Sequence, residues 1–321
     1  MEYAILGKAA FFAVAFAMQM GWLSWDMLGF GQDDDADDVA VKNPDQEPDP
    51  EDAKNTNYTA SDYASEQVGT SGNDTLGTST STDSVALFGL TGNDSLVGSA
   101  SDDYFEGDAG NDTINAFSGN DAAYGGGGND LFYGLGGDDT LYVDAGDDTS
   151  EGNTGDDNLF GGLGADSIAG GGGTDALNGE AGNDIISSDR LDSSADFSRG
   201  AGETLNGAEG EDTIIFSNVD QVSGGADADT FHYMYRNVTS DPVIITDFDK
   251  DIDTLTVHYT PQTDNQSNPI VPAKPLEIDA SIGETLIKLD DVVVAKLQGD
   301  ITISSSDVTP TEYDATFLDR L

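Results

Sequence analysis

The chain has 321 residues, of which 62 are Asp or Glu and 11 are Lys or Arg, so its formal net charge at pH 7 is −51. This balance excludes nucleic acid as a partner, because recognition of phosphates needs a basic surface. The absence of cysteine excludes disulfide scaffolds, thiolate metal sites and cysteine nucleophiles. The 40 glycines fit either a disordered acidic coil or a series of turns that collects cations, and residue spacing must decide between the two.

Residues 1–31 form an apolar start to the chain. Residues 9–25 are uncharged and mostly apolar, which is near the lower limit for a membrane span. Lys8 before this segment and aspartates after it predict an anchor with the N-terminus inside. Two alternatives remain open: a signal peptide cleaved near residues 15–17, or a hydrophobic helix docked on the protein. The first two readings deliver the rest of the chain outside the cell or to its surface.

Residues 32–68 are rich in Asp, Glu, Asn, Ser and Pro and lack periodicity, which predicts a disordered acidic linker. No Lys or Arg stands between Lys54 and Arg190. Salt bridges within that stretch therefore cannot offset its carboxylates, so solvent ions or bound metal must do so.

Aspartates recur every nine residues along the central part of the chain. They are Asp94, Asp103, Asp112, Asp121, Asp130, Asp139, Asp148, Asp157, Asp166, Asp175 and Asp184. A glycine stands two residues before each of them except at Ser101, and two residues after most of them stands a large apolar residue. Each unit therefore combines a turn that tolerates positive φ with a three-residue strand whose middle side chain is apolar.

One apolar side chain per nine residues forms a core only when units stack. Two units then make one coil of a solenoid with two parallel sheets. We expect Phe105, Ala123, Leu141, Leu159 and Leu177 to line one sheet inside, facing Leu96, Ile114, Phe132, Ile168 and Ile186. The predicted fold class is all-β: a parallel β-roll, or β-helix-like solenoid, with a C-terminal β cap.

Stacking also brings the aspartates of successive coils to the edges of the roll. Carboxylate and carbonyl oxygens in a flexible cage suit Ca2+, whereas Mg2+ demands a tight octahedron. Zn2+ would require His or Cys, which this region lacks. The sequence therefore predicts several bound Ca2+ ions.

The units at 134–141, 161–168 and 170–177 follow the pattern G-G-x-G-x-D-x-U-x. In this they resemble the RTX, or hemolysin-type, calcium-binding repeat. The resemblance implies a parallel β-roll in which the sixth-position Asp and turn carbonyls bind Ca2+. The expected ligands are the eleven aspartates above together with Asp74, Asp212 and Asp229.

Residues 224–231, 244–248 and 253–255 look like the final repeat and C-terminal cap of serralysin-type modules. The expected organisation is thus a roll at 69–231, interrupted by an insertion at 188–206. A β cap at 232–300 and a tail at 301–321, a possible type I secretion signal, complete it.

Some units depart from the repeat. Ser101 replaces the turn glycine, Ala116 and Val143 replace the first glycine, and Ser150 places a hydroxyl in the apolar column. We expect weaker or empty sites near these residues.

Other residues have two interpretations. His232 and His258, the two histidines, are expected to pack rather than to form a catalytic pair. Tyr124, Tyr142 and Phe160 should form an aromatic row on the outer face of one sheet. Either another part of the chain covers that row, or it contacts a sugar or a partner.

The chain has no H-E-x-x-H, G-x-S-x-G or phosphate-loop motif, so we expect no enzymatic activity. A paired-carboxylate site within the roll stays open as an alternative. The expected function is calcium binding by an exported or surface-held protein whose roll folds on meeting extracellular Ca2+. The alternative is a polysaccharide-associated module of an extracellular carbohydrate-modifying system that uses the aromatic row.

Overall fold

The structure, a computed structural model, describes residues 58–189, 202–217, 219–235 and 242–259 and short C-terminal strands between 262 and 312. The predicted apolar start at 1–31 and the linker as far as residue 57 lie outside the described residues, as does the end of the predicted tail from 313. Within the described part of the chain, no helix is long and apolar enough to cross a membrane.

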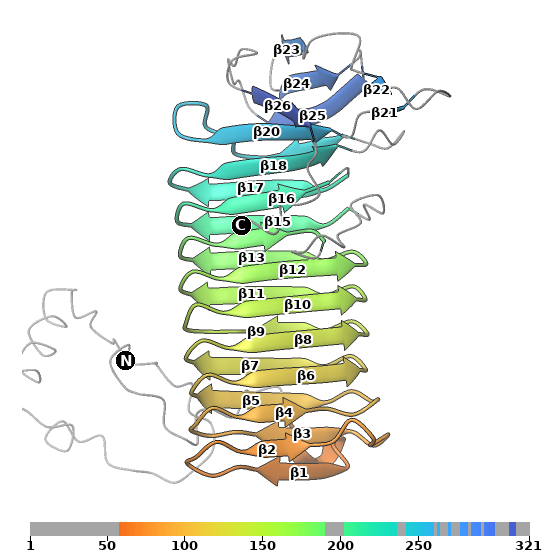
Figure 1. Ribbon diagram of the computed structural model, residues 1–321, viewed down its shortest axis with the longest axis vertical. Helices are drawn as coiled ribbons and strands as arrows, with labels where there is room; N and C mark the ends of the chain where they lie inside the picture. Colours follow the sequence, from red (N-terminus) through yellow and green to blue (C-terminus); the bar gives the residue numbers. More distant parts are fainter. Residues whose placement is uncertain are drawn as a thin grey trace, which may run out of the picture. The chain divides into compact units, whose positions relative to one another are not determined.

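Strands alternate along the chain between two long sheets (Figure 1). The first sheet contains, in order, β1 (Ser65–Val68), β3 (Val85–Phe88), β5 (Tyr104–Ala109), β7 (Ala122–Gly127), β9 (Thr140–Tyr142), β11 (Asn158–Leu163), β13 (Ala176–Ala181), β15 (Thr204–Glu209), β17 (Gln221–Ala226), β19 (Val243–Ile245), β25 (Val292–Gln298), β24 (Glu284–Leu289) and β23 (Glu277–Ser281).

The second sheet contains, in order, β2 (Thr75–Gly77), β4 (Ser95–Val97), β6 (Thr113–Ser118), β8 (Leu131–Gly136), β10 (Thr149–Thr154), β12 (Ser167–Gly172), β14 (Ile185–Ser187), β16 (Thr213–Phe216), β18 (Thr230–Tyr235), β20 (Thr254–Tyr259) and β26 (Val308–Glu312). A small separate hairpin joins β21 (Gln262–Thr263) to β22 (Pro269–Ile270). A short 3-10 helix, Ala60–Asp62, precedes β1.

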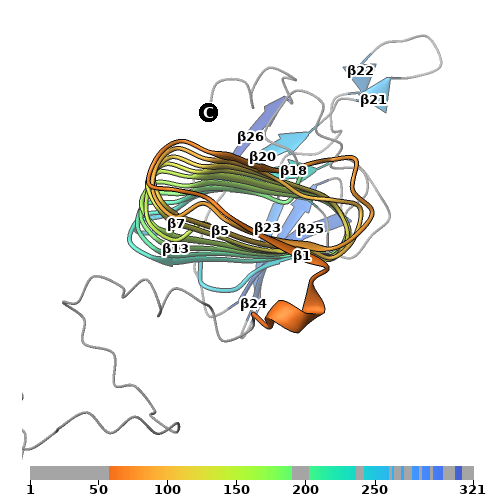
Figure 2. The same ribbon diagram turned by 90° about the horizontal axis from the view of Figure 1, so that it is seen from below.

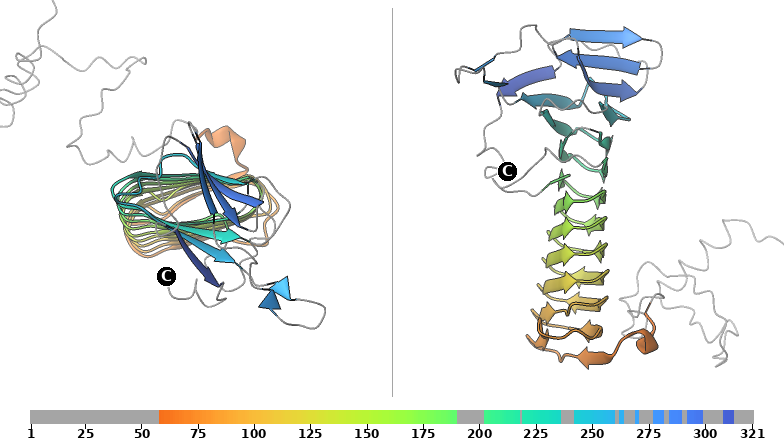
Figure 3. Two further views of the ribbon diagram at one scale, coloured as in Figure 1. Left: turned by 90° about the horizontal axis from the view of Figure 1, so that it is seen from above. Right: turned by 90° about the vertical axis from the view of Figure 1, so that its right-hand side faces the viewer.

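The pairing register confirms that two nine-residue units make one coil. Leu141 pairs with Leu159 and Leu159 with Leu177 in the first sheet, while Ile114 pairs with Phe132 in the second. Every residue expected to point inward is buried. Viewed along the axis, the coils superpose as a flattened ring with the two sheets facing each other (Figure 2), and from the side the strands form two columns (Figure 3). The predicted fold class, an all-β parallel roll, is confirmed.

The structure corrects the expected boundaries of the roll. The roll begins at Ser65 rather than at residue 69, because β1 already pairs in parallel with β3. It also continues past residue 231, because β19 and β20 pair in parallel with β17 and β18. At the expected insertion, residues 190–201 lie outside the described residues. Both sheets continue across this segment, because Thr204 of β15 pairs with Ala176 of β13 and β16 pairs with β14.

Beyond β19 the first sheet changes direction. β25 joins β19 in parallel, and β24 and β23 then add as antiparallel strands. β26, within the segment expected to be a tail, pairs in parallel with β20. At the start of this region, the Asp247 carboxylate accepts hydrogen bonds from the backbone N–H groups of Gly224 and Gly225, at 3.0 and 2.8 Å. The Asp247 carboxylate thus provides acceptors for two backbone N–H groups of β17.

The aromatic row forms as expected, and its geometry is informative. The ring centroids of Tyr124 and Tyr142 lie 5.0 Å apart with planes at 5°, and those of Tyr142 and Phe160 lie 4.6 Å apart at 7°. Both faces of the Tyr142 ring are therefore covered by neighbouring rings. Toward the N-terminal end, Tyr58 and Tyr63 pack on Tyr104, with centroids at 5.0 and 5.9 Å. The row stabilises the sheet chiefly through stacking between adjacent coils.

Ser150 lies in the apolar column between Phe132 and Ile168, and its buried hydroxyl makes no hydrogen bond to any described residue. Ser150→Ala removes this polar group, so we expect the free energy of unfolding to rise by about 1–3 kcal/mol. Denaturant unfolding at a fixed calcium concentration measures the change. Ser167→Ala, the same substitution at a half-buried outward position, is the control and should change stability by less than about 0.5 kcal/mol. A loss of stability in Ser150→Ala would contradict the assignment.

Candidate calcium-binding site

Each repeat aspartate stands at the junction of a turn and a strand, directly before the strand begins. The parallel register stacks these side chains into two ladders. The first ladder precedes the strands of the second sheet, and the second ladder precedes the strands of the first sheet. The first ladder contains Asp94, Asp112, Asp130, Asp148, Asp166, Asp184, Asp212 and Asp229, and the second contains Asp103, Asp121, Asp139, Asp157 and Asp175. All of these residues are buried, whereas Asp74 is half-buried.

One oxygen of each ladder carboxylate binds the preceding coil. The backbone N–H of Asp112 donates to Oδ1 of Asp130 at 2.7 Å, and the N–H of Asp121 donates to Oδ1 of Asp139 at 2.9 Å. Because the same bond repeats from coil to coil, Oδ1 fixes the orientation of every carboxylate.

The second oxygen is buried and has no such donor. Among the described residues, the Oδ2 atoms without a hydrogen-bond partner belong to Asp94, Asp112, Asp121, Asp130, Asp139, Asp148, Asp157, Asp166, Asp175, Asp184 and Asp212. A buried ionised carboxylate that lacks a partner costs several kcal/mol. Each ladder therefore requires protons or cations.

In most turns that begin with glycine, a backbone carbonyl of the next coil approaches the same point as Oδ2. A Cβ atom added to Gly107 would stand 2.5 Å from Oδ2 of Asp112 and 2.7 Å from the carbonyl oxygen of Gly125 in the next coil. At Gly161 the corresponding distances, to Asp166 Oδ2 and the Gly179 carbonyl, are 2.7 and 2.6 Å. The first glycine of the repeat is thus required by the close approach of two oxygens. Such a cradle of hard oxygen ligands suits Ca2+.

No group of three or more His, Cys, Asp or Glu side chains converges on one point within the described residues. A cation at the ladder would therefore be held by fewer than three such side chains, together with backbone oxygens of the glycine-rich turns. That donor set fits Ca2+, which accepts carbonyl ligands readily, and lacks the nitrogen or sulfur ligands of Zn2+.

The electrostatic environment reflects this arrangement. Burial raises the pKa of Asp121 to about 8, with a further contribution from Asp139, and raises the pKa of Asp130 and Asp139 to about 7. Ion pairs in the described part of the chain, Lys250 with Asp251 and Lys288 with Asp279, lie outside the ladders. In the absence of metal, the Asp121 carboxyl therefore holds a proton near neutral pH.

Two predicted ligands differ from the rest. Both oxygens of Asp103 accept hydrogen bonds, Oδ2 from the backbone N–H of Ser99 at 2.6 Å and Oδ1 from its hydroxyl at 3.0 Å. Oδ2 of Asp74 accepts from the N–H and hydroxyl of Thr70, at 2.5 and 2.9 Å. In both residues, Oδ2 therefore accepts hydrogen bonds, whereas in most ladder aspartates it has no donor.

The structure extends the ladders to residues that the sequence analysis missed. Oδ1 of Asp253 accepts from the N–H of Asp229 at 3.0 Å, which continues the first ladder. Oδ1 of Asp220 accepts from the N–H of Glu203 at 3.3 Å, which continues the second. Asp253 and Asp220 each precede an apolar residue by two positions, a signal present in the sequence. In the regular repeat, successive residues of one ladder are two units, or 18 residues, apart, and neither Asp253 nor Asp220 keeps that spacing.

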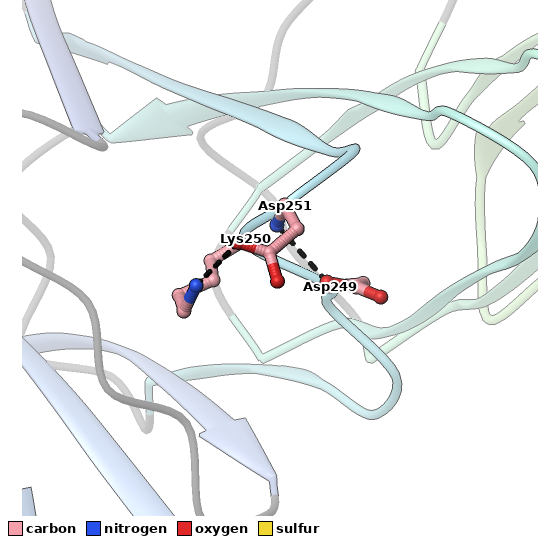
Figure 4. Close-up of polar contacts among 3 residues, drawn as sticks. All are labelled: Asp249, Lys250 and Asp251. Carbon is pink, nitrogen blue, oxygen red and sulfur yellow. Dashed lines mark hydrogen bonds and ion pairs between the residues drawn. The ribbon is translucent and has the colours of Figure 1, made fainter.

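Acidic residues alone do not make such a site, as the loop before β20 shows. There Asp249 accepts a hydrogen bond from the N–H of Asp251 at 2.9 Å, and Lys250 pairs with the Asp251 carboxylate (Figure 4). These side chains are exposed and bind local partners. The loop therefore lacks the buried oxygens that distinguish the ladders.

His232 and His258 lie side by side on β18 and β20, with Nδ1 of the former 3.0 Å from Nε2 of the latter. Burial lowers the pKa of both to about 4, and for His232 the neighbouring His258 lowers it further. Two uncharged rings in a half-buried position fit the expected packing role.

Comparison with known proteins agrees with the repeat geometry. Residues 86–114, 115–149 and 151–186 match the family model of the RTX calcium-binding nonapeptide repeat. The chain thus contains RTX hemolysin-type repeats. No curated protein matches it significantly. The expected likeness to a serralysin-type cap finds no support.

One similar solved structure is the solution structure of the AlgE6R3 subunit from the Azotobacter vinelandii mannuronan C5-epimerase. The two sequences are 24% identical, and the match covers 48% of this chain and 77% of the AlgE6R3 chain. The TM-score is 0.27, which is too low to support further comparison.

One turn offers a matched pair of variants for testing the oxygen cradle. A Cβ on Gly125 would lie 2.5 Å from both Asp130 Oδ2 and the Val143 carbonyl oxygen, whereas one on Gly127 would meet nothing within 4 Å. We expect Gly125→Ala to raise the calcium concentration at the folding midpoint several-fold and Gly127→Ala to leave it unchanged. A calcium titration followed by circular dichroism measures both. Equal midpoints for the two variants would rule out the cradle.

Calcium binding should also depend on pH. Burial raises the folded-state pKa values of Asp112, Asp121 and Asp130 from their ordinary 3.8 to about 6, 8 and 7. Metal-free folded coils are therefore favoured below pH 4 and lose that contribution as pH rises to about 8. Protons and Ca2+ compete for the same folded-state oxygens, but both stabilise the fold, so we expect the calcium concentration at the folding midpoint to rise between pH 5.5 and 8 and then level off. A midpoint independent of pH over this range, in titrations at constant ionic strength, would contradict the predicted competition.

Proposed function

We propose that the chain is an exported protein whose β-roll folds when it binds Ca2+ outside the cell, and that its role is structural or an interaction role rather than a catalytic one. The observation that carries this proposal is the repeated buried Oδ2 atom, which lacks a donor through most of the two ladders. Each such oxygen faces a glycine-rich turn, where a backbone carbonyl offers a second ligand.

Calcium binding at these positions would couple directly to folding. The oxygens converge only when successive coils are stacked, so a cation that binds them binds the folded state and not the extended chain. Weak extracellular sites, with dissociation constants of about 10⁻⁴–10⁻³ M, fill outside a cell and stay empty at cytosolic calcium levels. The roll would accordingly stay unfolded before export and fold after it.

The charge distribution supports the same proposal. No basic residue stands between Lys54 and Arg190, while the net charge is −51. Bound Ca2+ would take the place of the missing Lys and Arg as counter-ion along the edges of the roll. The repulsion that keeps an acidic chain extended without metal would thus be relieved coil by coil.

Export is part of the proposal, and the route has two forms. RTX repeats are typical of secreted proteins, and the tail at 301–321 would serve as a type I secretion signal. The apolar segment at 9–25 would instead hold the protein at the cell surface or act as a cleaved signal. In either case the roll would meet extracellular calcium.

The geometry weighs against the alternative of a polysaccharide-associated module. A sugar ring stacks on an open aromatic face, yet the rings of Tyr124, Tyr142 and Phe160 turn their faces toward one another. Mainly ring edges are directed outward. A sugar contact at this row stays a prediction, which a glycan array with and without Ca2+ would test.

A calcium titration from EDTA, followed by circular dichroism, tests the proposed function. We expect a transition from coil to β-structure, with several Ca2+ bound per chain by equilibrium dialysis. Asp139→Asn should raise the midpoint several-fold because it removes the charge at a buried ladder oxygen. Asp138→Asn is the matched control, since Asp138 is exposed and its Oδ1 accepts from Asp156 N–H, a bond that Asn can also accept. A chain that stays coil at about 10 mM Ca2+ would refute the proposal.

A further inference from the structure

We propose that the turns ending at Asp74 and Asp103 are closed by the side chains of Thr70 and Ser99 instead of by Ca2+. Among the ladder aspartates of the N-terminal end of the roll, from β1 to β5, Asp94 alone retains a buried Oδ2 without a hydrogen-bond partner. This end consequently folds without the metal and provides the surface on which the calcium-dependent coils assemble. This inference rests on the proposed calcium-dependent folding of the later coils.

Ser99 supplies donors that the turns of the regular repeat, from Asp112 to Asp184, lack at Oδ2. Its backbone N–H donates to Oδ2 of Asp103 at 2.6 Å and its hydroxyl donates to Oδ1 at 3.0 Å, while the N–H of Val85 also donates to Oδ1 at 2.7 Å. Asp103 is only 1% exposed, yet both of its oxygens have partners. The need for a cation that marks the other ladder residues is therefore removed at this position.

Thr70 repeats the arrangement in the other ladder, nearer the N-terminus. Its N–H and hydroxyl both donate to Oδ2 of Asp74, at 2.5 and 2.9 Å. Ser99 and Thr70 each stand four residues before their aspartate, the second position of the repeat. A serine or threonine at the second position thus distinguishes both turns from the turns of the regular repeat.

The backbone of the two turns differs accordingly. In calcium-type turns the second position is left-handed even when it is not glycine, with φ of 82° at Phe117 and 75° at Leu135. Neither Ser99 nor Thr70 has a positive φ. Ser and Thr favour local side-chain bonds that close a turn in the ordinary right-handed region. The Ser99 hydroxyl oxygen also accepts from the backbone N–H of Ser101 at 3.1 Å.

The same coils bury side chains on both faces of the first sheet. All four residues of β3 are buried, and on β5 both Tyr104 and Phe105 are buried. On the outside, Tyr58 and Tyr63 pack on Phe88 and Tyr104. Strands such as β8 and β10 instead alternate buried and half-exposed residues. The N-terminal coils therefore have apolar stabilisation that the central coils lack.

The direction of the ladder bonds explains how such an end could start assembly. The N–H of Asp103 donates to Oδ1 of Asp121, and the N–H of Asp94 donates to Oδ1 of Asp112, both at 2.7 Å. A folded N-terminal coil thus presents the donors that orient the carboxylates of the next coil. In a solenoid whose coils contact only their neighbours, such a template lowers the cost of adding the next coil.

Hydrogen exchange of the full chain, followed by mass spectrometry in EDTA and in saturating Ca2+, tests the proposal. We expect peptides within 65–109 to be protected in EDTA and peptides within 113–186 to gain protection only with Ca2+. Exchange in 65–109 as fast as in 113–186 in EDTA would overturn the inference and leave the proposed function intact. Full protection of 113–186 in EDTA would instead overturn the proposed function.

Calcium counting by equilibrium dialysis tests the closed turn directly. Ser99→Gly combined with Ser101→Gly restores the regular repeat sequence, so we expect one additional Ca2+ per chain and loss of protection over 85–109 in EDTA. Ser99→Thr keeps the hydroxyl and should retain the wild-type count. Ser118→Gly, at an exposed position of a calcium-type turn, is the matched control. An unchanged count in the double variant, with its fold confirmed in Ca2+, would contradict the role of Ser99.

Discussion

The structure depends on one recurring interaction, a buried aspartate with one oxygen bound to the protein and the other without a donor. Oδ1 accepts the N–H of the preceding coil, at 2.7 Å between Asp112 and Asp130, and so fixes the carboxylate in place. Oδ2 then points to the first glycine of its turn, beside a carbonyl oxygen of the next coil. Because the missing side chain of glycine creates that space, the first glycine, present in most units, and the carboxylate act together.

The thin core and the charged edges are consequences of the same nine-residue unit. Each unit contributes one inward side chain, such as Phe132 or Leu141, so apolar burial per coil is small. Edge neutralisation must supply the remainder of the stability, and the lack of basic residues between Lys54 and Arg190 assigns that role to a cation. Apolar burial is larger at Phe88 and Tyr104. There the Asp103 carboxylate accepts hydrogen bonds from the Ser99 hydroxyl and backbone N–H. The two sources of stability therefore vary in opposite directions along the roll.

The period made the sheets, their register and the inward columns predictable, because each depends only on spacing within the repeat. Features that break the period were not predictable in the same way. Asp253 and Asp220 were missed because irregular segments change their distance from Asp229 and Glu203, although the stacking places them in the ladders. At Asp103 the sequence pointed to Ser101, whereas Ser99 supplies the bonds to the carboxylate. The packing of Tyr58 and Tyr63 on the aromatic row is a tertiary contact that no local pattern specifies.

A crystal structure of the protein grown with Ca2+, with anomalous scattering used to locate the cations, tests the central claim most directly. The account predicts a cation about 2.3–2.6 Å from Oδ2 of ladder residues such as Asp112, Asp130 and Asp139, shared with turn carbonyls. It predicts no cation at Asp103. Ladder oxygens that bind only water or protons in saturating Ca2+ would contradict it.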